Sequence, residues 1–334
     1  MALAAAGCGG AAPATVSAPR APSAPAGEGA ATRPAPKPAP APRRAWVALE
    51  GEGRVAVLSA RPRWRVVRRV RVPPGPHNLA AAPGGRVVAV TSPPADRVTL
   101  LDGDGRVRTH VRVPGSPHDA AFTPDGRRLW VTAERGRRLV ALDPRTGRRL
   151  RTRATTGPPH DLAVAPDGRT LWITLDGSSR VEIRDARTGA LRRRADLGGA
   201  PHDLAFAPGG GRVWLSNFAS GTLTVAAARP ARRLGALSAG AEPHHFAFGA
   251  SALWASDNGG GTLERIDPRR RRVLGRTRVG ARPHHVVVSG RDVLVAVNGT
   301  GRVAVVDGAG RLVRSLAVGA GPHGIDAAPE ATTR

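Results

Sequence analysis

The chain has 334 residues, a length that suits one large domain or two ordinary ones. Hydrophobic residues make up 41% of it, enough for a packed core, and no apolar run reaches the roughly 18 residues of a membrane-spanning helix. A single cysteine excludes an internal disulfide framework and a cysteine-based zinc site. The formal net charge of +26 favours anionic partners, although the 51 basic residues include one lysine (Lys37), which also fits a coding bias toward arginine.

Residues 1–43 differ in composition from the rest of the chain. Cys8 follows Ala5-Ala6-Gly7, which resembles a bacterial lipobox, so residues 1–8 are expected to be a truncated lipoprotein signal with Cys8 lipidated. The alternative is a chance match within an alanine-rich tail. Nine prolines over residues 9–43 predict a disordered Ala/Pro-rich linker. We therefore expect an extracytoplasmic protein, either a membrane-anchored lipoprotein or secreted.

Internal repetition is the strongest signal in the sequence. The dipeptide Pro-His occurs seven times, with its histidine at His77, His118, His160, His202, His244, His284 and His323. Successive histidines are 41, 42, 42, 42, 40 and 39 residues apart. A period near 40 residues with short apolar runs is typical of a β-propeller, in which each repeat forms one four-stranded blade.

The repeat that begins at His160 illustrates the expected blade. An alternating run over residues 162–165 predicts the inner strand, and Pro-Asp-Gly at 166–168 predicts a tight turn. Residues 171–174 and 181–183 predict the middle strands, and residues 191–197 the outer strand. Between the last two strands, Asp-Ala-Arg-Thr-Gly predicts a hairpin turn, because aspartate accepts hydrogen bonds from the following backbone and glycine tolerates positive φ.

The two ends of the repeat array are incomplete and complement each other. One strand, over residues 324–328, follows the last Pro-His, whereas three strands, over residues 46–49, 55–58 and 65–72, precede the first. Pairing the C-terminal strand with those three completes a last blade and removes free sheet edges. We therefore predict an all-β fold over residues 44–328, a seven-bladed β-propeller of four-stranded antiparallel blades, with residues 329–334 as a tail.

A recurrent tryptophan marks the second strand of several repeats. The strands read Trp130-Val131-Thr132, Trp172-Ile173-Thr174, Trp214-Leu215-Ser216-Asn217 and Trp254-Ala255-Ser256-Asp257. With Pro-Asp-Gly before and Asp-x-x-Thr-Gly after, the repeat resembles the YVTN-type β-propeller family, with tryptophan in place of tyrosine. The resemblance covers the whole propeller and implies a secreted or surface-anchored bacterial propeller, mostly a binding module without an assigned reaction. A fold alone does not determine a function.

Three further segments resemble streptogramin B (virginiamycin B) lyase, which is also seven-bladed. They are Arg282-Pro283-His284, Pro322-His323-Gly324-Ile325 and Trp46-Val47-Ala48-Leu49-Glu50. The resemblance implies that His284 and His323 match the catalytic histidines of the lyases and that Glu50 matches their metal-binding glutamate. Glu50 and His323 are then the candidate ligands of a divalent metal, either Mg²⁺ or a transition metal.

The seven repeated histidines allow two interpretations. As scaffold, each fixes its turn by bonding a neighbouring strand or blade, which a residue present in every repeat explains most simply. As a site, they form a ring of imidazoles at the mouth of the central channel, where neutral imidazole binds transition metals. Both interpretations stay open at this point.

A ligand site is expected where the repeat departs from its own symmetry. The residue after the repeated histidine is itself a histidine in two neighbouring units. The candidate ligand-binding residues are His77, His244, His245, His284, His285, His323, Asn258 and Asn298. Glu50 and Glu52 are expected in a loop on the same face. Because adjacent side chains of a strand point to opposite sides, His245 and His285 have packing between blades as their alternative.

Tryptophan and arginine supply two further expectations. The tryptophans of the second strands are expected to pack between blades, whereas Trp64, beside an outer strand, is expected to be exposed. Arginines gather on the outer strands, most densely over residues 61–71, where charge blocks edge-to-edge association of sheets. Attraction to an anionic cell-envelope polymer or a membrane surface is the alternative. Aromatic residues make up only 3% of the chain, so no dedicated nucleic-acid reader is expected.

These observations favour a binding role over a catalytic one. We expect a monomeric, extracytoplasmic binding module with an unknown ligand or partner protein on the face that carries the Pro-His turns. The first alternative is a metal-dependent lyase or lactonase, in which His323 or His284 is the general base and Glu50 holds a divalent ion. The second alternative is an arginine-dependent binder of an envelope polymer.

Overall fold

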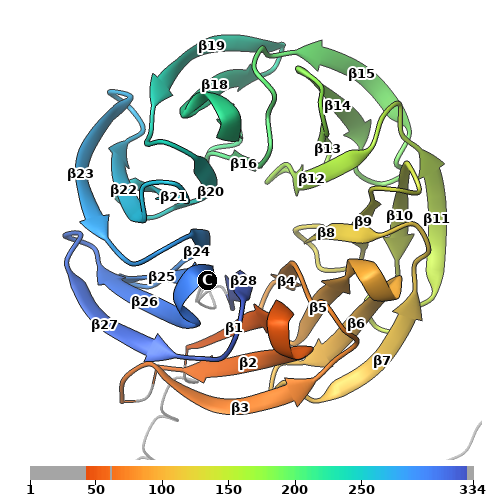
Figure 1. Ribbon diagram of the computed structural model, residues 1–334. Helices are drawn as coiled ribbons and strands as arrows, with labels where there is room; N and C mark the ends of the chain where they lie inside the picture. The colour runs from red at the N-terminus through yellow and green to blue at the C-terminus, as the bar shows by residue number, and fades with distance from the viewer. Residues whose placement is uncertain (1–42, 61, 329–334) are drawn as a thin grey trace, which may run out of the picture. The chain divides into compact units, whose positions relative to one another are not determined.

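The computed structural model describes residues 43–60 and 62–328 of the chain. These residues form a ring of seven four-stranded antiparallel sheets (Figure 1). The predicted seven-bladed all-β propeller is therefore confirmed. Cys8, the predicted linker and the predicted tail lie outside the described residues. Within the described part, no helix has the length and apolar character needed to cross a membrane.

The blades are numbered here along the chain, and their strands are given from the centre outward. Blade 1 consists of β4 (Leu79–Ala81), β5 (Val87–Ser92), β6 (Arg97–Asp102) and β7 (Val107–Arg112). Blade 2 consists of β8 (Pro117–Phe122), β9 (Leu129–Ala133), β10 (Arg138–Leu142) and β11 (Arg149–Ala154). Blade 3 consists of β12 (Pro159–Val164), β13 (Thr170–Leu175), β14 (Arg180–Asp185) and β15 (Leu191–Asp196). Blade 4 consists of β16 (Leu204–Phe206), β17 (Arg212–Asn217), β18 (Thr222–Ala228) and β19 (Ala231–Ser238).

The remaining blades follow the same order. Blade 5 consists of β20 (Pro243–Phe248), β21 (Leu253–Asp257), β22 (Thr262–Asp267) and β23 (Arg272–Arg278). Blade 6 consists of β24 (Pro283–Ser289), β25 (Asp292–Val297), β26 (Arg302–Asp307) and β27 (Leu312–Ala317). Blade 7 consists of β28 (Pro322–Ala327), β1 (Arg44–Leu49), β2 (Arg54–Ser59) and β3 (Arg65–Arg71). Four short 3₁₀ helices lie in loops: η1 (Glu50–Glu52), η2 (Pro93–Ala95), η3 (Phe218–Ser220) and η4 (Asn298–Thr300).

Blade 7 joins the two ends of the propeller, as predicted. β28 pairs antiparallel with β1, placing Val47 opposite Ile325 and Leu49 opposite Pro322. The strand begins before the predicted residue 324, because Pro322 and His323 already belong to the ladder. The closure covers the inner edge of β1 with β28, and it brings the loop after β1 beside the last Pro-His turn.

The core lies between neighbouring blades rather than inside one of them. In β13, Leu171 and Ile173 pack toward blade 2 while Trp172 packs toward blade 4, as the alternation of side chains along a strand requires. The tryptophans of the second strands are all nearly inaccessible, with Trp254 the most exposed at 2%. Their predicted packing between blades is confirmed.

The expected exposure of Trp64 is wrong, because its side chain is 4% exposed. Trp64 precedes β3 and reaches the adjacent blade 6, where its Nε1 donates a hydrogen bond to Oδ2 of Asp292 at 2.9 Å. An indole at the junction of two blades is sheltered even though its own strand is an outer one, and this junction does not exist in the linear sequence.

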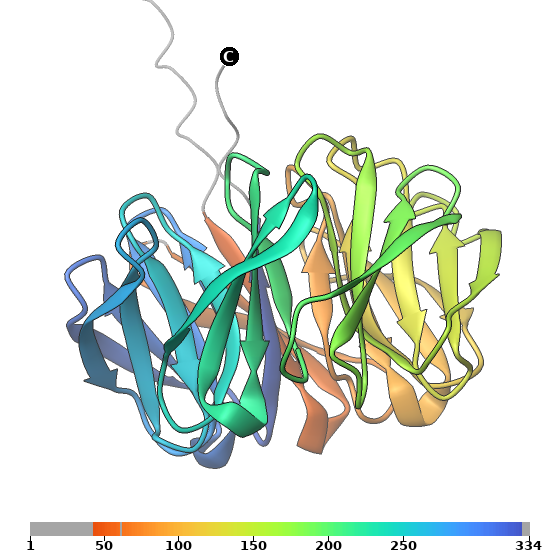
Figure 2. The ribbon, with the colours of Figure 1, turned by 90° about the horizontal axis from the view of Figure 1, so that it is seen from above.

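Loops gather on two opposite faces, because the strands cross the thickness of the ring (Figure 2). The face with the Pro-His turns also carries the loops with the four 3₁₀ helices, since Glu50 N–H donates to Gly321 O at 2.9 Å. We call this the Pro-His face. The opposite face, here the far face, carries the Pro-Asp-Gly turns and the hairpins that lead into the outer strands.

Candidate functional site

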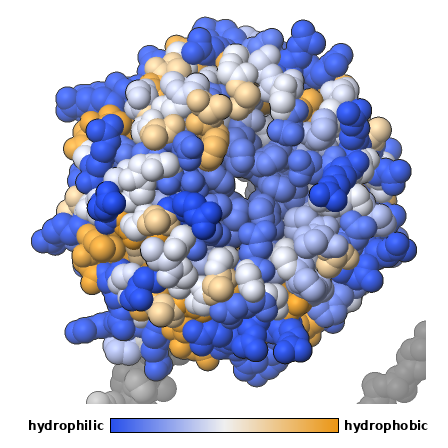
Figure 3. Space-filling model, in the orientation of Figure 1, coloured by the Kyte–Doolittle hydropathy of each residue, from blue (hydrophilic) through white to orange (hydrophobic). Residues whose placement is uncertain are grey.

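Seven imidazoles form a closed ring at the centre of the Pro-His face. Neighbouring ring centroids are between 3.8 and 4.7 Å apart at every step, including the step from His323 back to His77. The space-filling view shows a hydrophilic surface around a small central opening (Figure 3). Each blade contributes one histidine at or just before the start of its inner strand, so the ring follows directly from the repeat.

Hydroxyl groups on the second strands hold the backbone of this ring. The Thr174 hydroxyl donates to His202 O at 2.8 Å and accepts from Asp161 N at 3.0 Å, which ties blade 3 to blade 4. Equivalent hydroxyls join the next blades at Thr91, Thr132, Ser216 and Ser256. In blades 6 and 7 the equivalent residues are Ala296 and Ala48. The scaffold interpretation therefore holds for the backbone of the repeated histidines.

The imidazole side chains themselves are not used by the scaffold. Within the described part of the chain, Nδ1 is buried without a hydrogen-bond partner in His118, His160, His202, His244, His284 and His323. In the seventh, His77, Nδ1 is 3.3 Å from Oε1 of Glu50, and Nε2 is 3.1 Å from Nε2 of His118. Three of these Nδ1 nitrogens, in His118, His160 and His202, face the carboxylate of Asp161 at 3.4, 3.4 and 3.8 Å. Those of His244, His284 and His323 face no carboxylate within 4 Å among the described residues.

One half of the ring is lined by carboxyl groups, and we call it the acid side. Asp119, Asp161 and Asp203 follow the ring histidines of blades 2 to 4. The carboxylate of Asp161 lies 3.4 Å from Nδ1 of both His118 and His160, without hydrogen-bond geometry. Asp119 Oδ2 instead accepts a hydrogen bond from Leu162 N at 3.0 Å, which fastens blade 2 to blade 3.

Charge on the acid side is concentrated in one pair. Burial opposes the charge of His160, but the carboxylate of Asp161 outweighs it and raises the pKa of His160 to about 9. Burial likewise opposes the charge of Asp161, yet the charge of His160 and the contact with His118 hold its pKa well below its usual range. Burial and the charge of Asp161 raise the pKa of Asp119 well above its usual range. The pKa of Asp203 is raised for the same two reasons. An ion pair between His160 and Asp161, flanked by carboxyl groups whose ionisation is disfavoured, follows from these shifts.

The other half of the ring is lined by imidazoles, and we call it the imidazole side. It comprises His244, His245, His284, His285 and His323 from blades 5 to 7. His245 and His285 stack with their centroids 4.1 Å apart, and His285 lies 5.2 Å from His323. His245 also accepts a hydrogen bond from Val286 N at 3.3 Å, so it both bridges two blades and lies beside the ring.

Three members of the imidazole side offer a set of metal ligands. One nitrogen from each of His244, His284 and His323 lies within 4.8 Å of the others. Burial and neighbouring histidines lower the pKa of His244 and of His323 well below the usual value. Burial and the charge of His77 lower the pKa of His284 to about 4. Neutral imidazoles are the form that binds metal ions.

Glu50 belongs to a second group, with His77 and His323, whose ligand atoms also lie within 4.8 Å of one another. A hydrogen bond from His77 and the charge of that imidazole lower the pKa of Glu50 against the effect of burial. The sequence predicted that closure would bring Glu50 near His323, and the structure brings both to this group. The two groups share His323, so one ion could engage only one of them fully.

Asn258, Asn298 and Glu52 lie on the Pro-His face outside these groups. Asn258 N and Asn298 N donate to the backbone of Glu242 and Arg282, at 2.9 and 3.0 Å. Within the described residues, neither asparagine side chain forms a hydrogen bond. Glu52 Oε1 accepts a hydrogen bond from Ala320 N at 2.7 Å, which fixes the turn before β28. The two asparagines therefore remain predicted ligand-binding residues, and neither belongs to the two histidine groups described above.

Sequence reasoning assigned no role to the three aspartates of the acid side or to the second-strand hydroxyls. Both sets of residues stand at fixed distances from the repeated histidine. The aspartates directly follow the repeated histidine, and in the first four repeats Thr or Ser stands 14 residues after it. A hydroxyl at a fixed distance from a buried turn indicates a hydrogen bond to that turn, which these residues form.

Solved structures of the same architecture resemble the chain in fold. A periplasmic gluconolactonase from Pseudomonas aeruginosa is 20% identical, covers 87% of this chain and 100% of its own, and has a TM-score of 0.71. A putative 6-phosphogluconolactonase from Bacteroides fragilis is 14% identical, with coverage of 88% and 99% and a TM-score of 0.74. A functionally unknown protein from Desulfotomaculum acetoxidans is 14% identical, with coverage of 86% and 99% and a TM-score of 0.75. At these identities the likeness shows the fold alone.

The comparison with curated proteins gives no match. A family model does match, over residues 48–332, which span almost the whole propeller. This match is consistent with the resemblance to YVTN-type propellers that the repeated strands and turns carry. The chain belongs to the YNCE-like beta-propeller family.

Proposed function

We propose that this propeller is a ligand-binding module whose site is the imidazole side of the ring, and that its ligand is a divalent transition-metal ion. The observation that carries the proposal is the group formed by His244, His284 and His323, whose ligand nitrogens lie within 4.8 Å of one another. Each of these residues also keeps a buried Nδ1 without a hydrogen-bond partner. Free imidazole nitrogens in a closed cluster are the donor set that Zn²⁺, Ni²⁺ and Cu²⁺ prefer.

The distances fit such an ion after a small adjustment. Metal–nitrogen bonds of about 2.0–2.1 Å place tetrahedral ligand nitrogens roughly 3.4 Å apart. Nitrogens within 4.8 Å of one another therefore need to approach by at most about 1.5 Å. Side-chain rotation supplies movement on this scale, and His285 beside His323 offers a further nitrogen donor. Water completes the coordination where protein ligands are absent.

Electrostatics on the two sides of the ring favour this location for the ion. The imidazole side is neutral because the pKa of each of its ring histidines is lowered. On the acid side, the charge of Asp161 is already paired with His160, and the pKa of Asp119 is raised. A cation entering the ring thus meets uncharged nitrogen ligands on one side and a satisfied ion pair on the other.

Calorimetric titration of chelator-treated protein with ZnCl₂ and NiCl₂ tests the proposal. We expect one ion per chain, and weakening of about 100-fold or more in His284→Ala and in His323→Ala, since even outer-shell partners of metal ligands contribute 10–100-fold. His202→Ala is the matched control, because it removes a ring imidazole outside the cluster and should bind as the unchanged chain does. Absence of binding, or equal weakening in all three variants, contradicts the proposal.

A metal-dependent lactonase or lyase is the second candidate. Two observations favour it: Glu50 lies 3.3 Å from His77 in a group with His323, and several solved structures of this fold are described as gluconolactonases. Glu50 would hold a divalent ion, and His323 or His284 would take a proton from the attacked molecule or from water. Assays against gluconolactones and cyclic depsipeptides with Glu50→Gln distinguish the candidates, because this variant should lose activity and yet keep the three-histidine site.

We further propose an extracytoplasmic, lipid-anchored location, which rests on Cys8 and the proline-rich stretch after it. Fractionation of bacterial cells that express the full-length protein tests it. Cys8→Ala should move the protein from the membrane to the soluble extracytoplasmic fraction, and unchanged membrane association would contradict the anchor.

A further inference from the structure

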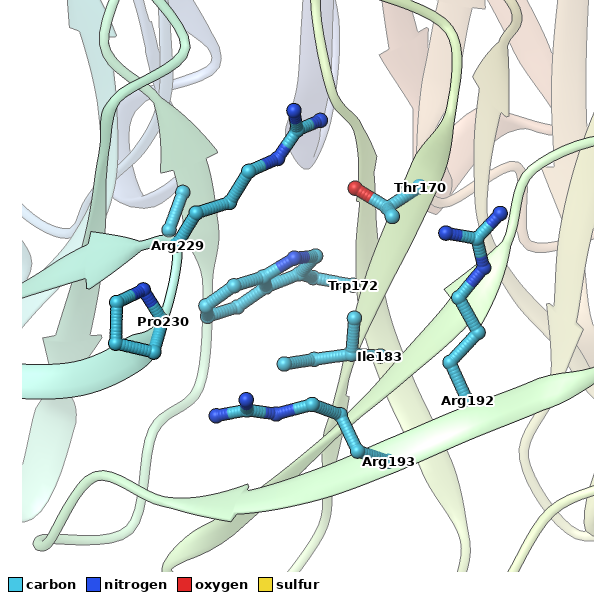
Figure 4. A pocket seen from close by; sticks show the side chains of 8 residues that line it. Thr170, Trp172, Ile183, Arg192, Arg193, Arg229 and Pro230 are labelled. Carbon is cyan, nitrogen blue, oxygen red and sulfur yellow. The ribbon is translucent and has the colours of Figure 1, made fainter.

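The far face holds a pocket of about 280 Å³ between blades 3 and 4 (Figure 4). Blade 3 contributes Trp172 and Ile183 from its middle strands and two arginines from β15, and blade 4 contributes its turn between β18 and β19. This volume is close to the lower end of the range for small-molecule sites, about 300–1,000 Å³. It is far from the histidine ring, because the far face and the Pro-His face lie at opposite ends of the strands.

The pocket exists because blade 4 departs from the repeat at this turn. In blade 3 the turn closes over Trp130 of blade 2: Ala186 O accepts from Nε1 of Trp130 at 2.8 Å. Gly189 (φ +69°) lies so near this indole that an added Cβ would be 2.6 Å from its edge. Blade 4 lacks the Asp-x-x-Thr-Gly turn, and only Arg229 and Pro230 join its outer two strands.

The shorter turn leaves the pocket beside Trp172, whereas the longer turn of blade 3 covers Trp130. The indole of Trp172 is 1% exposed to bulk solvent, and within the described residues its N–H has no hydrogen-bond acceptor. Within the described residues, the indole N–H groups of Trp214 and Trp254 also have no hydrogen-bond acceptor. An indole N–H without an acceptor therefore does not by itself mark a site. The missing turn and the charges around the opening distinguish this pocket.

Three arginines line the opening around the indole. Figure 4 shows Arg229 above Trp172, Arg193 below it and Arg192 to one side. Arg192 pairs with Asp185 at 2.5 Å and Arg229 pairs with Asp167, both on the exposed surface. Arg193 donates to Ala231 O at 2.8 Å and has no carboxylate within 4 Å among the described residues. The pocket therefore combines an apolar wall with a surplus positive charge.

We infer that this pocket binds a small phosphate ester with a flat apolar group. Guanidinium groups form charge-assisted, often bidentate bonds with phosphate. Among the described residues Arg193 has no carboxylate partner, and a phosphate dianion would compete with Asp185 and Asp167 for Arg192 and Arg229.

The flat group would pack on the exposed ring of Pro230 and the aliphatic stems of the arginines, above the buried Trp172 and Ile183, where burial of apolar surface adds affinity. The hydroxyl of Thr170, which also lines the pocket, offers a further donor.

A titration with phenyl phosphate, measured by calorimetry and by tryptophan fluorescence, tests the inference. We expect phenyl phosphate to bind at least tenfold more tightly than either inorganic phosphate or phenol, because only the ester engages both the guanidinium groups and the apolar wall of the pocket. Benzoate tests whether the pocket prefers phosphate to carboxylate, and we expect it to bind at least tenfold more weakly than phenyl phosphate. Equal affinity for phenyl phosphate and inorganic phosphate, or for phenyl phosphate and benzoate, overturns the inference.

Matched variants localise the site. Arg193→Gln should weaken phenyl phosphate at least tenfold, whereas Arg151→Gln should leave it unchanged. Arg151 is the proper control, because it faces Ala141 in blade 2 as Arg193 faces Ile183 in blade 3. Equal weakening by both variants would mean diffuse attraction to the arginine-rich rim and would overturn the inference. His284→Ala should bind phenyl phosphate normally, which keeps this result independent of the proposed metal site.

Discussion

The acid side and the imidazole side of the central ring share a backbone but differ in chemistry. Both present a ring histidine from each blade, with successive centroids 4.0–4.7 Å apart along blades 2 to 7. Behind that histidine the acid side carries carboxyl groups, and the imidazole side carries His245, His285 and then Gly324. On the acid side the carboxyl groups produce an ion pair, whereas the imidazole side keeps neutral nitrogens free for a ligand.

This difference teaches that the position after the repeated histidine is the variable part of the scaffold. The hydroxyl of the second strand bonds the backbone of that residue and not its side chain, as the Thr174 contact to Asp161 N shows. The side chain can therefore change from blade to blade without loss of the turn. Four experiments, from the largest expected effect to the smallest, would break or sharpen the comparison.

Asp161→Asn should destabilise the protein by about 4 kcal/mol, because it removes one partner of a buried ion pair. Urea-induced unfolding at pH 7 measures the change. Asp119→Asn is the matched control, and it should cost less than about 1 kcal/mol, since burial and Asp161 disfavour the charge of Asp119 and an amide keeps an oxygen to accept from Leu162 N. Equal losses in the two variants would remove the distinction between the paired carboxylate and the carboxyl group whose charge is disfavoured.

Raising the pH should weaken the acid side. The pKa of His160 is raised to about 9, above the roughly 6.5 of an unfolded chain. Its contribution to stability is therefore complete below pH 6.5 and is lost as the pH rises through 9, by about 3 kcal/mol in total. Unfolding curves at pH 6.5, 8 and 9.5 measure this loss against a small background, because the chain has no tyrosine and one cysteine. His160→Gln should show a shallower loss over the same interval, and a slope equal to that of the unchanged chain would contradict the assignment.

Zinc should stabilise the folded protein through the imidazole side alone. At a free concentration 100 times its dissociation constant, an ion that binds only the folded state adds about 2.7 kcal/mol. Thermal unfolding with and without ZnCl₂ should show this increment in the unchanged chain and in His202→Ala, but not in His284→Ala. An increment that survives in His284→Ala would place the ion elsewhere.

The second-strand hydroxyls should give the smallest effects. Thr174→Val keeps the shape but removes the bonds to His202 O and Asp161 N, and should cost about 1–2 kcal/mol in urea unfolding. The reverse change on the imidazole side, Ala296→Ser, adds a hydroxyl at the equivalent place and should gain up to about 1 kcal/mol. A gain in Thr174→Val would show that these bonds do not hold the ring.

Much of the fold and part of the site were predictable from the sequence. Seven equally spaced Pro-His pairs indicate the number of blades, and the unequal ends indicate that β28 completes the sheet of β1. The approach of Glu50 to the last Pro-His turn follows from that closure. Burial of Trp64 was not predictable, because Asp292, which accepts its N–H, is 228 residues away in the chain. The contact of Asp161 with His118 also depends on two blades meeting, since His118 belongs to blade 2 and Asp161 to blade 3.

The amino-acid sequence by itself determined the ring, because a repeat with strand-and-turn chemistry at a constant period has one way to bury its apolar faces and close its edges. The tertiary structure decided which atoms of that ring are free, charged or paired. Protonation and metal binding depend on distances of a few ångströms between side chains from different blades, and the sequence records only which residues are present and not those distances.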